Sequence, residues 1–237
     1  MAYQLQEINR RIKTDVTEFL EECDQAYAQR VSLAADRILS NLDKSPVVLL
    51  SGPSGSGKTT TAMKIAEEPP APGCQYPRGG YGQLLQEPEP QDRAPQPPRE
   101  TSTTNLPSAW IWSCWTSTSP ALSRGEEIII PKFEFARQMR NDARGTPLKL
   151  GKNEIAIFEG IHALNDDIAG PHPEAAKLYI SARSNVNDGA ALRFKGTWMR
   201  LTRRAVRDYS FRGTGVADTL EMWANVRRGV EAVYLPL

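Results

Sequence analysis

Glycines, serines, a lysine and two threonines lie close together between residues 52 and 60, in the run Gly-Pro-Ser-Gly-Ser-Gly-Lys-Thr-Thr. The run matches the pattern G-x-x-x-x-G-K-S/T at every fixed position. Glycines at this spacing let backbone N–H groups turn inward around a phosphate, while the lysine reaches the β and γ oxygens and the first threonine offers its hydroxyl to Mg²⁺. The alternative interpretation is an ordinary Gly/Ser turn in front of a helix.

These residues predict a binding site for the phosphates of ATP together with Mg²⁺. Its candidate residues are Gly52, Ser54, Gly55, Ser56, Gly57, Lys58, Thr59 and Thr60. The mechanism needs a strand before the glycines and a helix after the lysine. Val47–Ser51 is aliphatic and β-branched, as a buried strand would be, and Thr60–Glu67 has the composition of a helix.

An acid at the end of a second apolar run is the next candidate. Residues 154–162 read Glu-Ile-Ala-Ile-Phe-Glu-Gly-Ile-His, which is typical of a buried strand with Glu159 at its end. This is the form of a Walker B strand. The alternative is a plain charge at a strand end.

Arginines recur along a third segment, residues 199–213, which is expected to be a helix that ends at Gly213. They lie on nearly one helical face, so a lid carrying them could neutralise charge on a phosphoryl group in transfer. The alternative is a solvated helix or one that binds nucleic acid. The four residues are Arg203, Arg204, Arg207 and Arg212.

The order of these segments predicts the fold class. Strands alternate with helices, which indicates an α/β fold with a doubly wound parallel sheet of the P-loop NTPase type, and ligands at the carboxyl ends of its strands. We expect this domain to span residues 46–237. In front of it, apolar spacings of three and four over residues 3–23 and 27–42 predict a helical hairpin, an appendage at 1–45. The hairpin is either a surface for a homo-oligomer or a partner, or is packed on the domain.

Composition narrows the function classes. The 237 residues carry a formal charge of +1, which gives no global attraction to nucleic acid or acidic membranes. Three cysteines without paired spacing and the absence of a long apolar run lead us to expect a reduced, cytoplasmic protein without disulfides or zinc. His162 and His172 have no partners at metal-ligand spacing, and we assign them no role.

Residues 69–120 differ from the rest of the chain. They hold 11 of the 18 prolines and three of the five tryptophans, without helical or strand periodicity, so we expect poor order and no strand or helix there. A Pro-rich linker is one explanation. Our hypothesis is a reading-frame error, because shifted frames can give MDNYFKN from Tyr81–Pro88 and EGDVDYESPECLDMELLDEHF from Pro98–Ser119.

Four blocks together resemble the uridine kinase and phosphoribulokinase family of P-loop kinases, most closely uridine kinase-like bacterial nucleoside kinases. The blocks are 52–60, 130–140, 157–164 and 203–213, similar respectively to the family's phosphate loop, P-x-Y-D-F-x(4)-R, (I/V)-x-E-G-I-x-A-L and R-R-x-x-R-D-x(3)-R-G. The resemblance implies that Lys58, Glu159, Arg203, Arg204, Arg207 and Arg212 take part in catalysis. It also implies that Thr59 and Glu159 are at the metal, and that Phe133, Phe135 and Arg140 line a nucleoside pocket.

The implied activity is ATP- and Mg²⁺-dependent phosphorylation of the 5′-hydroxyl of a pyrimidine nucleoside, uridine or cytidine. The family's catalytic aspartate corresponds to the aspartate of MDNYF, which the chain as written lacks, so its activity is expected to be impaired. Phe133-Glu134 replaces the family's Tyr-Asp pair, which leaves base specificity open. The alternatives are a kinase for pantothenate or another small alcohol, and a non-catalytic ATP-binding regulator whose basic helix binds RNA.

Overall fold

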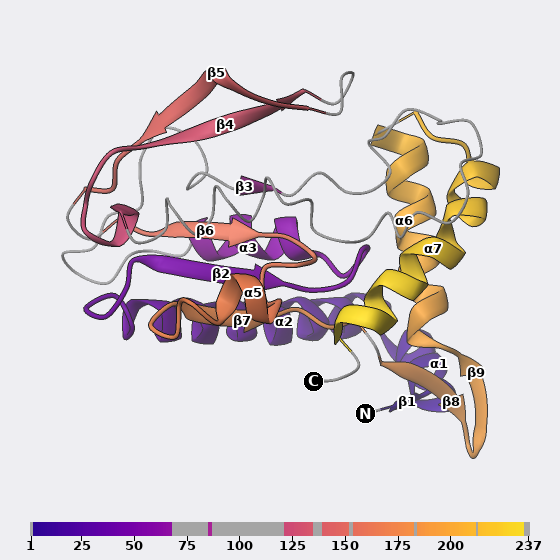
Figure 1. Ribbon diagram of the computed structural model, residues 1–237. Coiled ribbons are helices and arrows are strands. Elements are labelled where there is room, and N and C mark those ends of the chain that lie inside the picture. Colours follow the sequence, from indigo (N-terminus) through magenta and orange to yellow (C-terminus); the bar gives the residue numbers. More distant parts are fainter. Residues whose placement is uncertain are drawn as a thin grey trace.

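The computed structural model describes residues 2–67, 85–86, 121–134, 139–151, 154–182, 184–211 and 213–234. At its centre lies a four-stranded parallel sheet (Figure 1). The strand order is β3 (Leu85–Gln86), β6 (Ala156–Glu159), β2 (Val47–Ser51) and β7 (Ala176–Tyr179). The predicted α/β class with a parallel sheet is therefore confirmed.

The strand β2 is buried along its whole length and separates two hydrophobic clusters. Because successive side chains of a strand point to opposite faces, Val47 and Leu49 join one cluster while Val48 and Leu50 join the other. A run of consecutive apolar residues is what a parallel strand covered on both faces requires. The sheet is thus packed on both sides, and β2 is its core strand.

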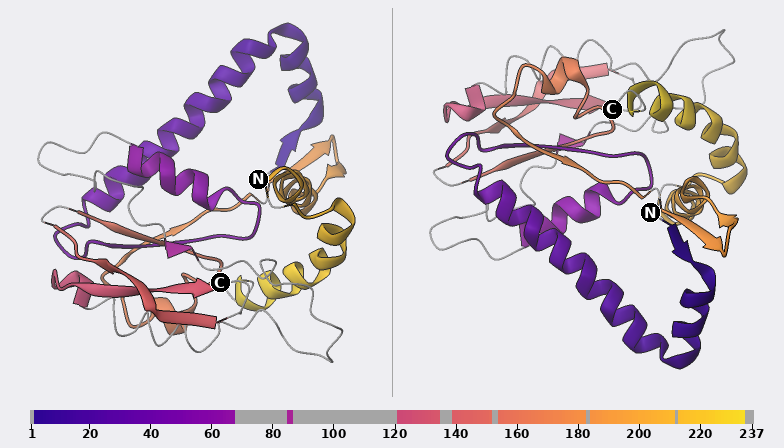
Figure 2. Two further views of the ribbon diagram at one scale, coloured as in Figure 1. Left: turned by 90° about the horizontal axis from the view of Figure 1, so that it is seen from above. Right: turned by 90° about the horizontal axis from the view of Figure 1, so that it is seen from below.

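Helices cover each face. On one face, α2 (Val16–Leu39) and α3 (Lys58–Glu67) pack through Val31, Ile38 and Ile65. The other face is covered by α5 (Asp166–Ala169), by the first residue of β4 (Ile128–Glu134) and by the last residue of β5 (Met139–Leu148). Figure 2 shows α2 and α3 on one side of the sheet and α5 on the other.

The N-terminal helices divide at a different residue from the one predicted. The short strand β1 (Ala2–Gln4) leads into α1 (Leu5–Thr14), and α2 begins at Val16, so the predicted helix over 3–23 is interrupted. Asp15 is extended and its carboxylate accepts a hydrogen bond from the backbone N–H of Glu18, which caps α2. No residue of α1 is buried, whereas the C-terminal half of α2 lies in the core.

A second sheet forms from segments that are far apart in the sequence. β1 pairs in parallel with β8 (Asn185–Asp188), which pairs antiparallel with β9 (Ala191–Phe194). Figure 2 shows α1 and α2 as two sides of an arch that returns β1 to this hairpin. This hairpin lies directly before the basic helix in the sequence.

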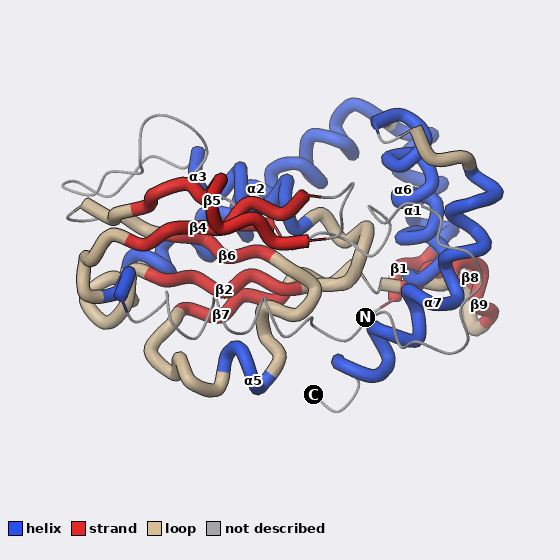
Figure 3. The backbone as a smooth tube through the Cα atoms, turned by 45° about the horizontal axis from the view of Figure 1, so that its top comes forward, coloured by secondary structure: helices blue, strands red, loops and turns tan. Residues whose placement is uncertain are grey.

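Two long helices follow, α6 (Gly196–Phe211) and α7 (Val216–Tyr234). The basic helix expected over 199–213 is confirmed, with its start three residues earlier, and Gly213 takes a left-handed φ of 65° after its end. In Figures 1 and 3 both helices stand beyond the carboxyl ends of the parallel strands. That is the edge where α/β folds bind ligands.

The interval 69–120 lies outside the described residues except for β3. Leu85 and Gln86 pair with Phe158 and Glu159 of β6, so the expectation that no strand runs through this interval is wrong at these two residues. Backbone pairing to an existing strand needs no hydrophobic pattern, which is why the sequence carries no sign of it. Among the described residues, no helix has the length and apolar character needed to cross a membrane.

Candidate active site

The run predicted as a phosphate loop connects the carboxyl end of β2 to the N-terminus of α3. Gly55 and Gly57 take left-handed φ values of 75° and 97°, which turn the backbone back toward the helix. A side-chain carbon built on Gly52 would lie 2.3 Å from the carbonyl oxygen of Ile180, so only glycine fits there. The glycines of the pattern are thus needed for both curvature and close packing.

The helix begins at Lys58, so its first backbone N–H groups point into the loop. Unbonded N–H groups and the positive end of the helix dipole favour an anion at this place. Lys58 is only 7% exposed, and it is held at the base of the loop and not extended into solvent. A loop of this geometry with a buried lysine is suited to hold a polyphosphate.

Glu159 ends β6, the strand next to β2, and stands in register with Leu50. The carboxyl ends of parallel neighbours meet at one edge of the sheet, which brings the acid to the loop. The hydroxyl of Thr59 donates a 2.6 Å hydrogen bond to Oε1 of Glu159. The two residues predicted to lie at the metal are therefore in contact.

This pair fits a magnesium ion bound through a nucleotide. Mg²⁺ keeps several waters and takes one or two protein oxygens together with phosphate oxygens, so a hydroxyl and one carboxylate are enough. The described residues contain no group of three or more His, Cys, Asp or Glu side chains that could hold a metal alone. A metal at this site would therefore depend on the phosphates of its ligand.

The helix α6 packs against the loop with a charged stripe. Arg200, Arg204 and Asp208 repeat at intervals of four residues and are all buried. Nη1 of Arg204 donates a 2.5 Å hydrogen bond to the hydroxyl of Ser54, and its Nε lies 3.5 Å from the carboxylate of Asp208. The helix is thus joined to the loop through buried polar contacts, and its apolar residues face outward.

The predicted lid arginines separate into distinct positions. Arg204 is fully buried behind the loop, whereas Arg203 is exposed and its Nη2 would lie 3.3 Å from a side-chain carbon built on Gly57. Arg207 forms a 2.8 Å ion pair with Asp208. Arg212 lies outside the described residues. Of the described three, Arg203 is the one placed at the mouth of the loop.

Two of the three residues predicted to contact a nucleoside lie on the β4–β5 hairpin. Phe133 and Arg140 stand opposite each other in its register, although they are seven residues apart in sequence. Phe135 lies outside the described residues. The hairpin is a pair of antiparallel strands.

His162 lies three residues after Glu159 and is 6% exposed. Burial lowers the pKa of its imidazole to about 4, because the apolar surroundings disfavour the charged form. The ring is therefore neutral near pH 7. We assigned this histidine no role from the sequence, and its place behind the loop is consistent with a neutral packing residue.

Sequence analysis missed two contributors to the site. Arg200 places its guanidinium 5.5 Å from the ring centre of Trp223 and directs Nη1 toward the carbonyl of Ser54. The carboxylate of Asp208 forms ion pairs with both Arg204 and Arg207. The sequence signal for both residues is a spacing of four between charged residues, which places Arg200, Arg204 and Asp208 on one helical stripe.

The comparisons with known proteins show a shared fold but do not identify a family for this chain. No protein-family model matches the sequence, and no curated protein matches it. Among solved structures, the chain is similar to a protein from Silicibacter sp. TM1040 provisionally named a fructose transport system kinase, with a TM-score of 0.57 and 19% identity over 86% of this chain and 94% of that one. At this identity, the likeness shows a shared fold alone.

Proposed function

We propose that the chain is an ATP-dependent phosphotransferase with an alcohol acceptor, and that the acceptor is the 5′-hydroxyl of a pyrimidine nucleoside, uridine first. The observation that carries the proposal is the hydrogen bond from Thr59 to Glu159, which joins a phosphate-binding loop to an acid at the edge of the sheet. This pairing of hydroxyl and carboxylate beside a buried lysine is what a nucleotide with bound Mg²⁺ needs.

Each residue then has a role. Lys58 and the backbone N–H groups of the loop bind the β- and γ-phosphates, and Thr59 with Glu159 would hold Mg²⁺, which neutralises phosphate charge when bound. Arg203, at the mouth of the loop, would meet the phosphoryl group in transfer. Arg204 acts through Ser54 and positions the loop.

The acceptor side of the proposal rests on the resemblance to the uridine kinase family. Phe133, Phe135 and Arg140 would contact the nucleoside, and the pairing of Phe133 with Arg140 in one hairpin supports their acting together. An aromatic ring can stack on a pyrimidine, and a guanidinium can bind its oxygens. Substitution of these side chains would raise KM for the nucleoside before it changed the affinity for ATP.

The general base is the missing part. We propose that the chain as written binds ATP and transfers little phosphate, because the aspartate of MDNYF is absent. The register of β3 supports this placement, since Gln86 pairs with Glu159 and brings the segment in question to the edge of the site. A positioned base contributes about 100- to 10,000-fold in rate.

The experiment measures ADP formation with a panel of acceptors: uridine, cytidine, pantothenate and fructose, the last because the structurally similar protein carries it in its name. A chain restored to read MDNYFKN and DYESPECLDMELLDEHF should phosphorylate uridine at least 100-fold faster than the chain as written. Exchange of the restored aspartate for asparagine should remove most of that gain while leaving ATP affinity unchanged.

Other outcomes separate the alternatives. Turnover with pantothenate or fructose and none with nucleosides would keep the phosphotransferase and replace the acceptor. ATP binding and salt-dependent RNA affinity, without phosphorylation of any acceptor, would favour a regulator that binds RNA. Equal uridine phosphorylation by the written and restored chains would contradict the proposed base.

A further inference from the structure

A pocket of about 530 Å³ lies beside the phosphate loop, on the side of α3 that faces α2. Its walls come from four parts of the chain: α2, the loop with the first turns of α3, the segment that follows β7, and α6. Pockets of this size suit a small organic ligand. Neither the loop pattern nor the family resemblance assigned any residue of α2 to a site.

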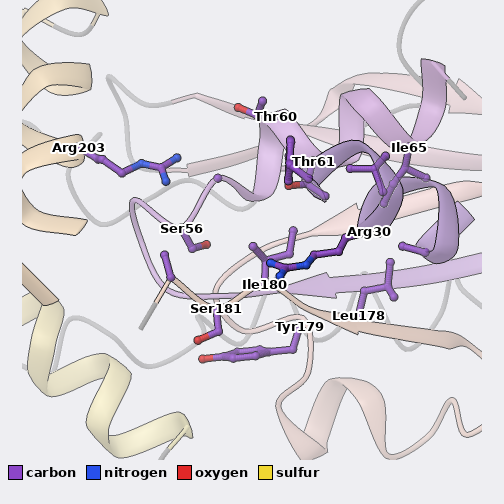
Figure 4. Close-up of a pocket in the computed structure, with 15 residues that line it drawn as sticks. Arg30, Ser56, Thr60, Thr61, Ile65, Leu178, Tyr179, Ile180, Ser181 and Arg203 are labelled. Carbon is purple, nitrogen blue, oxygen red and sulfur yellow. The ribbon is translucent and has the colours of Figure 1, made fainter. Parts of the chain in front are cut away.

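The charges around the pocket have one sign. Arg30 enters from α2 and Arg203 from α6, and no aspartate or glutamate is among the described residues that line the pocket. Figure 4 shows the two guanidinium groups pointing into the space from different sides, with Ser56 between them. Two cations without a lining acid favour a ligand that carries negative charge on an adjoining group, as a nucleotide does.

The rest of the lining is largely apolar. Aliphatic side chains of α2, α3 and the β7 end form it, with the rings of Tyr27 and Tyr179. The hydroxyl of Tyr27 is fixed by a 2.8 Å hydrogen bond with the hydroxyl of Thr61, which ties α2 to α3 at the pocket wall. Aliphatic and aromatic walls beside a guanidinium suit a flat ring that carries polar groups.

A buried hydroxyl faces this space. Ser56 is 7% exposed, and its Oγ has no hydrogen-bond partner within the part of the chain that the structure describes. Buried polar side chains are normally satisfied, so an orphaned hydroxyl in a pocket wall indicates a ligand that bonds to it. This observation is independent of the charges of Arg30 and Arg203.

The pocket is continuous with the loop at Ser56 and Gly57 and at Thr60 and Thr61. In a phosphate loop, the α- and β-phosphates lie against backbone N–H groups at this end, where the helix begins. The remainder of a nucleotide whose phosphates occupied the loop would therefore enter the pocket. We infer that the pocket holds the ribose and base of that nucleotide, and that Arg30, from the N-terminal helix, contacts this nucleoside moiety.

The inference rests on the proposed ATP binding, and the test separates the two by using ATP and inorganic tripolyphosphate as probes in calorimetric titrations of the full chain. Lys58→Ala should weaken both probes. Arg30→Ala should weaken ATP about tenfold, as expected for loss of a stacked guanidinium, and leave tripolyphosphate within about twofold. Arg37→Ala, an exposed arginine on the same helix, is the matched control and should change neither.

A second variant fills the pocket without removing charge. Ala34→Phe places a ring into the space from α2. It should weaken the binding of ATP and leave the binding of tripolyphosphate unchanged. Equal affinity of the unaltered chain for the two probes would overturn the inference and keep phosphate binding. An equal loss of affinity for both probes in Arg30→Ala would also overturn the inference, because Arg30 would then contact the phosphates. Failure of the unaltered chain to bind either probe would overturn the proposed function and the inference together.

Discussion

Thr59 and Glu159 are joined by a 2.6 Å hydrogen bond across 100 residues of sequence. The bond connects the first turn of α3 with the last residue of β6, so the loop and the acid keep one spacing before any ligand arrives. The two side chains are therefore already adjacent in the structure without a ligand. Under the proposed function, Thr59 and Glu159 would hold Mg²⁺, which would neutralise phosphate charge.

Glu159→Gln tests this arrangement. The amide keeps the shape of the side chain and removes its charge, so ATP affinity in the absence of Mg²⁺ should stay within about threefold, while the gain in affinity that Mg²⁺ brings should fall by about tenfold. Titrations of ATP with and without Mg²⁺ measure both quantities. Glu154→Gln, at the other end of the same segment, is the control and should leave the Mg²⁺ effect unchanged. A full Mg²⁺ effect in Glu159→Gln would remove this residue from the metal site.

Gly55→Ala and Gly125→Ala form a matched pair. Both glycines have a left-handed φ, 75° and 74°, so both substitutions carry the same backbone strain of about 1 to 2 kcal/mol. Only at Gly55 would the new methyl group meet another backbone atom, the carbonyl oxygen of Arg200 at 2.8 Å. Urea unfolding should show a larger loss for Gly55→Ala, and ATP binding should weaken only in that variant. Equal losses would mean that α6 does not hold the loop at this contact.

Arg204 and Arg203 should differ in what they support. Arg204 is fully buried between Ser54 and Asp208, so Arg204→Ala leaves polar groups without their partner and should lower the free energy of unfolding by about 3 to 5 kcal/mol. Arg203 is exposed at the mouth of the loop, and Arg203→Ala should change stability by less than about 0.5 kcal/mol while lowering turnover. Thermal unfolding and turnover of the restored chain distinguish the two. A stability loss in Arg203→Ala as large as in Arg204→Ala would contradict the assignment.

His162 should make stability depend on pH. Its pKa is lowered by burial from 6.5 to about 4 in the folded protein, so between these values the unfolded chain binds a proton that the folded chain does not. The free energy of unfolding therefore falls as pH drops through this window, by about 1.4 kcal/mol per pH unit at most. Urea unfolding at about pH 7 and about pH 4.5 should show a drop that is about 2 kcal/mol smaller in His162→Gln. The same drop in both proteins would show that another group carries the dependence.

The sequence predicts the loop and the acid because their chemistry is local. A strand, a glycine turn and a helix follow one another within residues 47–67, and Glu159 closes a short apolar run of its own. Each of these patterns is complete without knowledge of the rest of the chain. Their meeting also follows from sequence, because parallel neighbours end at one edge of a sheet.

The charged face of α6 was not predictable in the same way. Helix periodicity predicts that apolar residues turn inward, yet Arg204 and Asp208 are buried while Val206, Tyr209 and Phe211 are exposed. The inversion occurs because the surface that receives α6 is a polar loop, whose hydroxyls and carbonyls pair with charged side chains. The partner that favours burial of Arg204 is Ser54, which lies about 150 residues earlier in the sequence.

The break at Asp15 was missed for a different reason. Apolar residues continue at spacings of three and four across the break, at Ile12, Val16 and Phe19, so periodicity alone predicts one continuous helix. The cap of Asp15 with Glu18 three residues later was the available signal. The contribution of α2 to the pocket was beyond prediction, since it depends on a long-range contact between Tyr27 and Thr61.

The pairing of β1 with β8 depends on the rest of the fold. Ala2 and Asn185 are partners in this small sheet, and closing so long a loop in an unfolded chain is entropically unfavourable. Once the rest of the fold has formed, the two segments are already held near each other and this entropic cost is largely removed. Because every residue of β1 and β9 is exposed, the small sheet has little burial to hold it and should be among the first parts to open. Opening of this sheet, measured as rapid amide exchange at β8 and β9, would then loosen the N-terminus of α6 while the core around β2 stays folded.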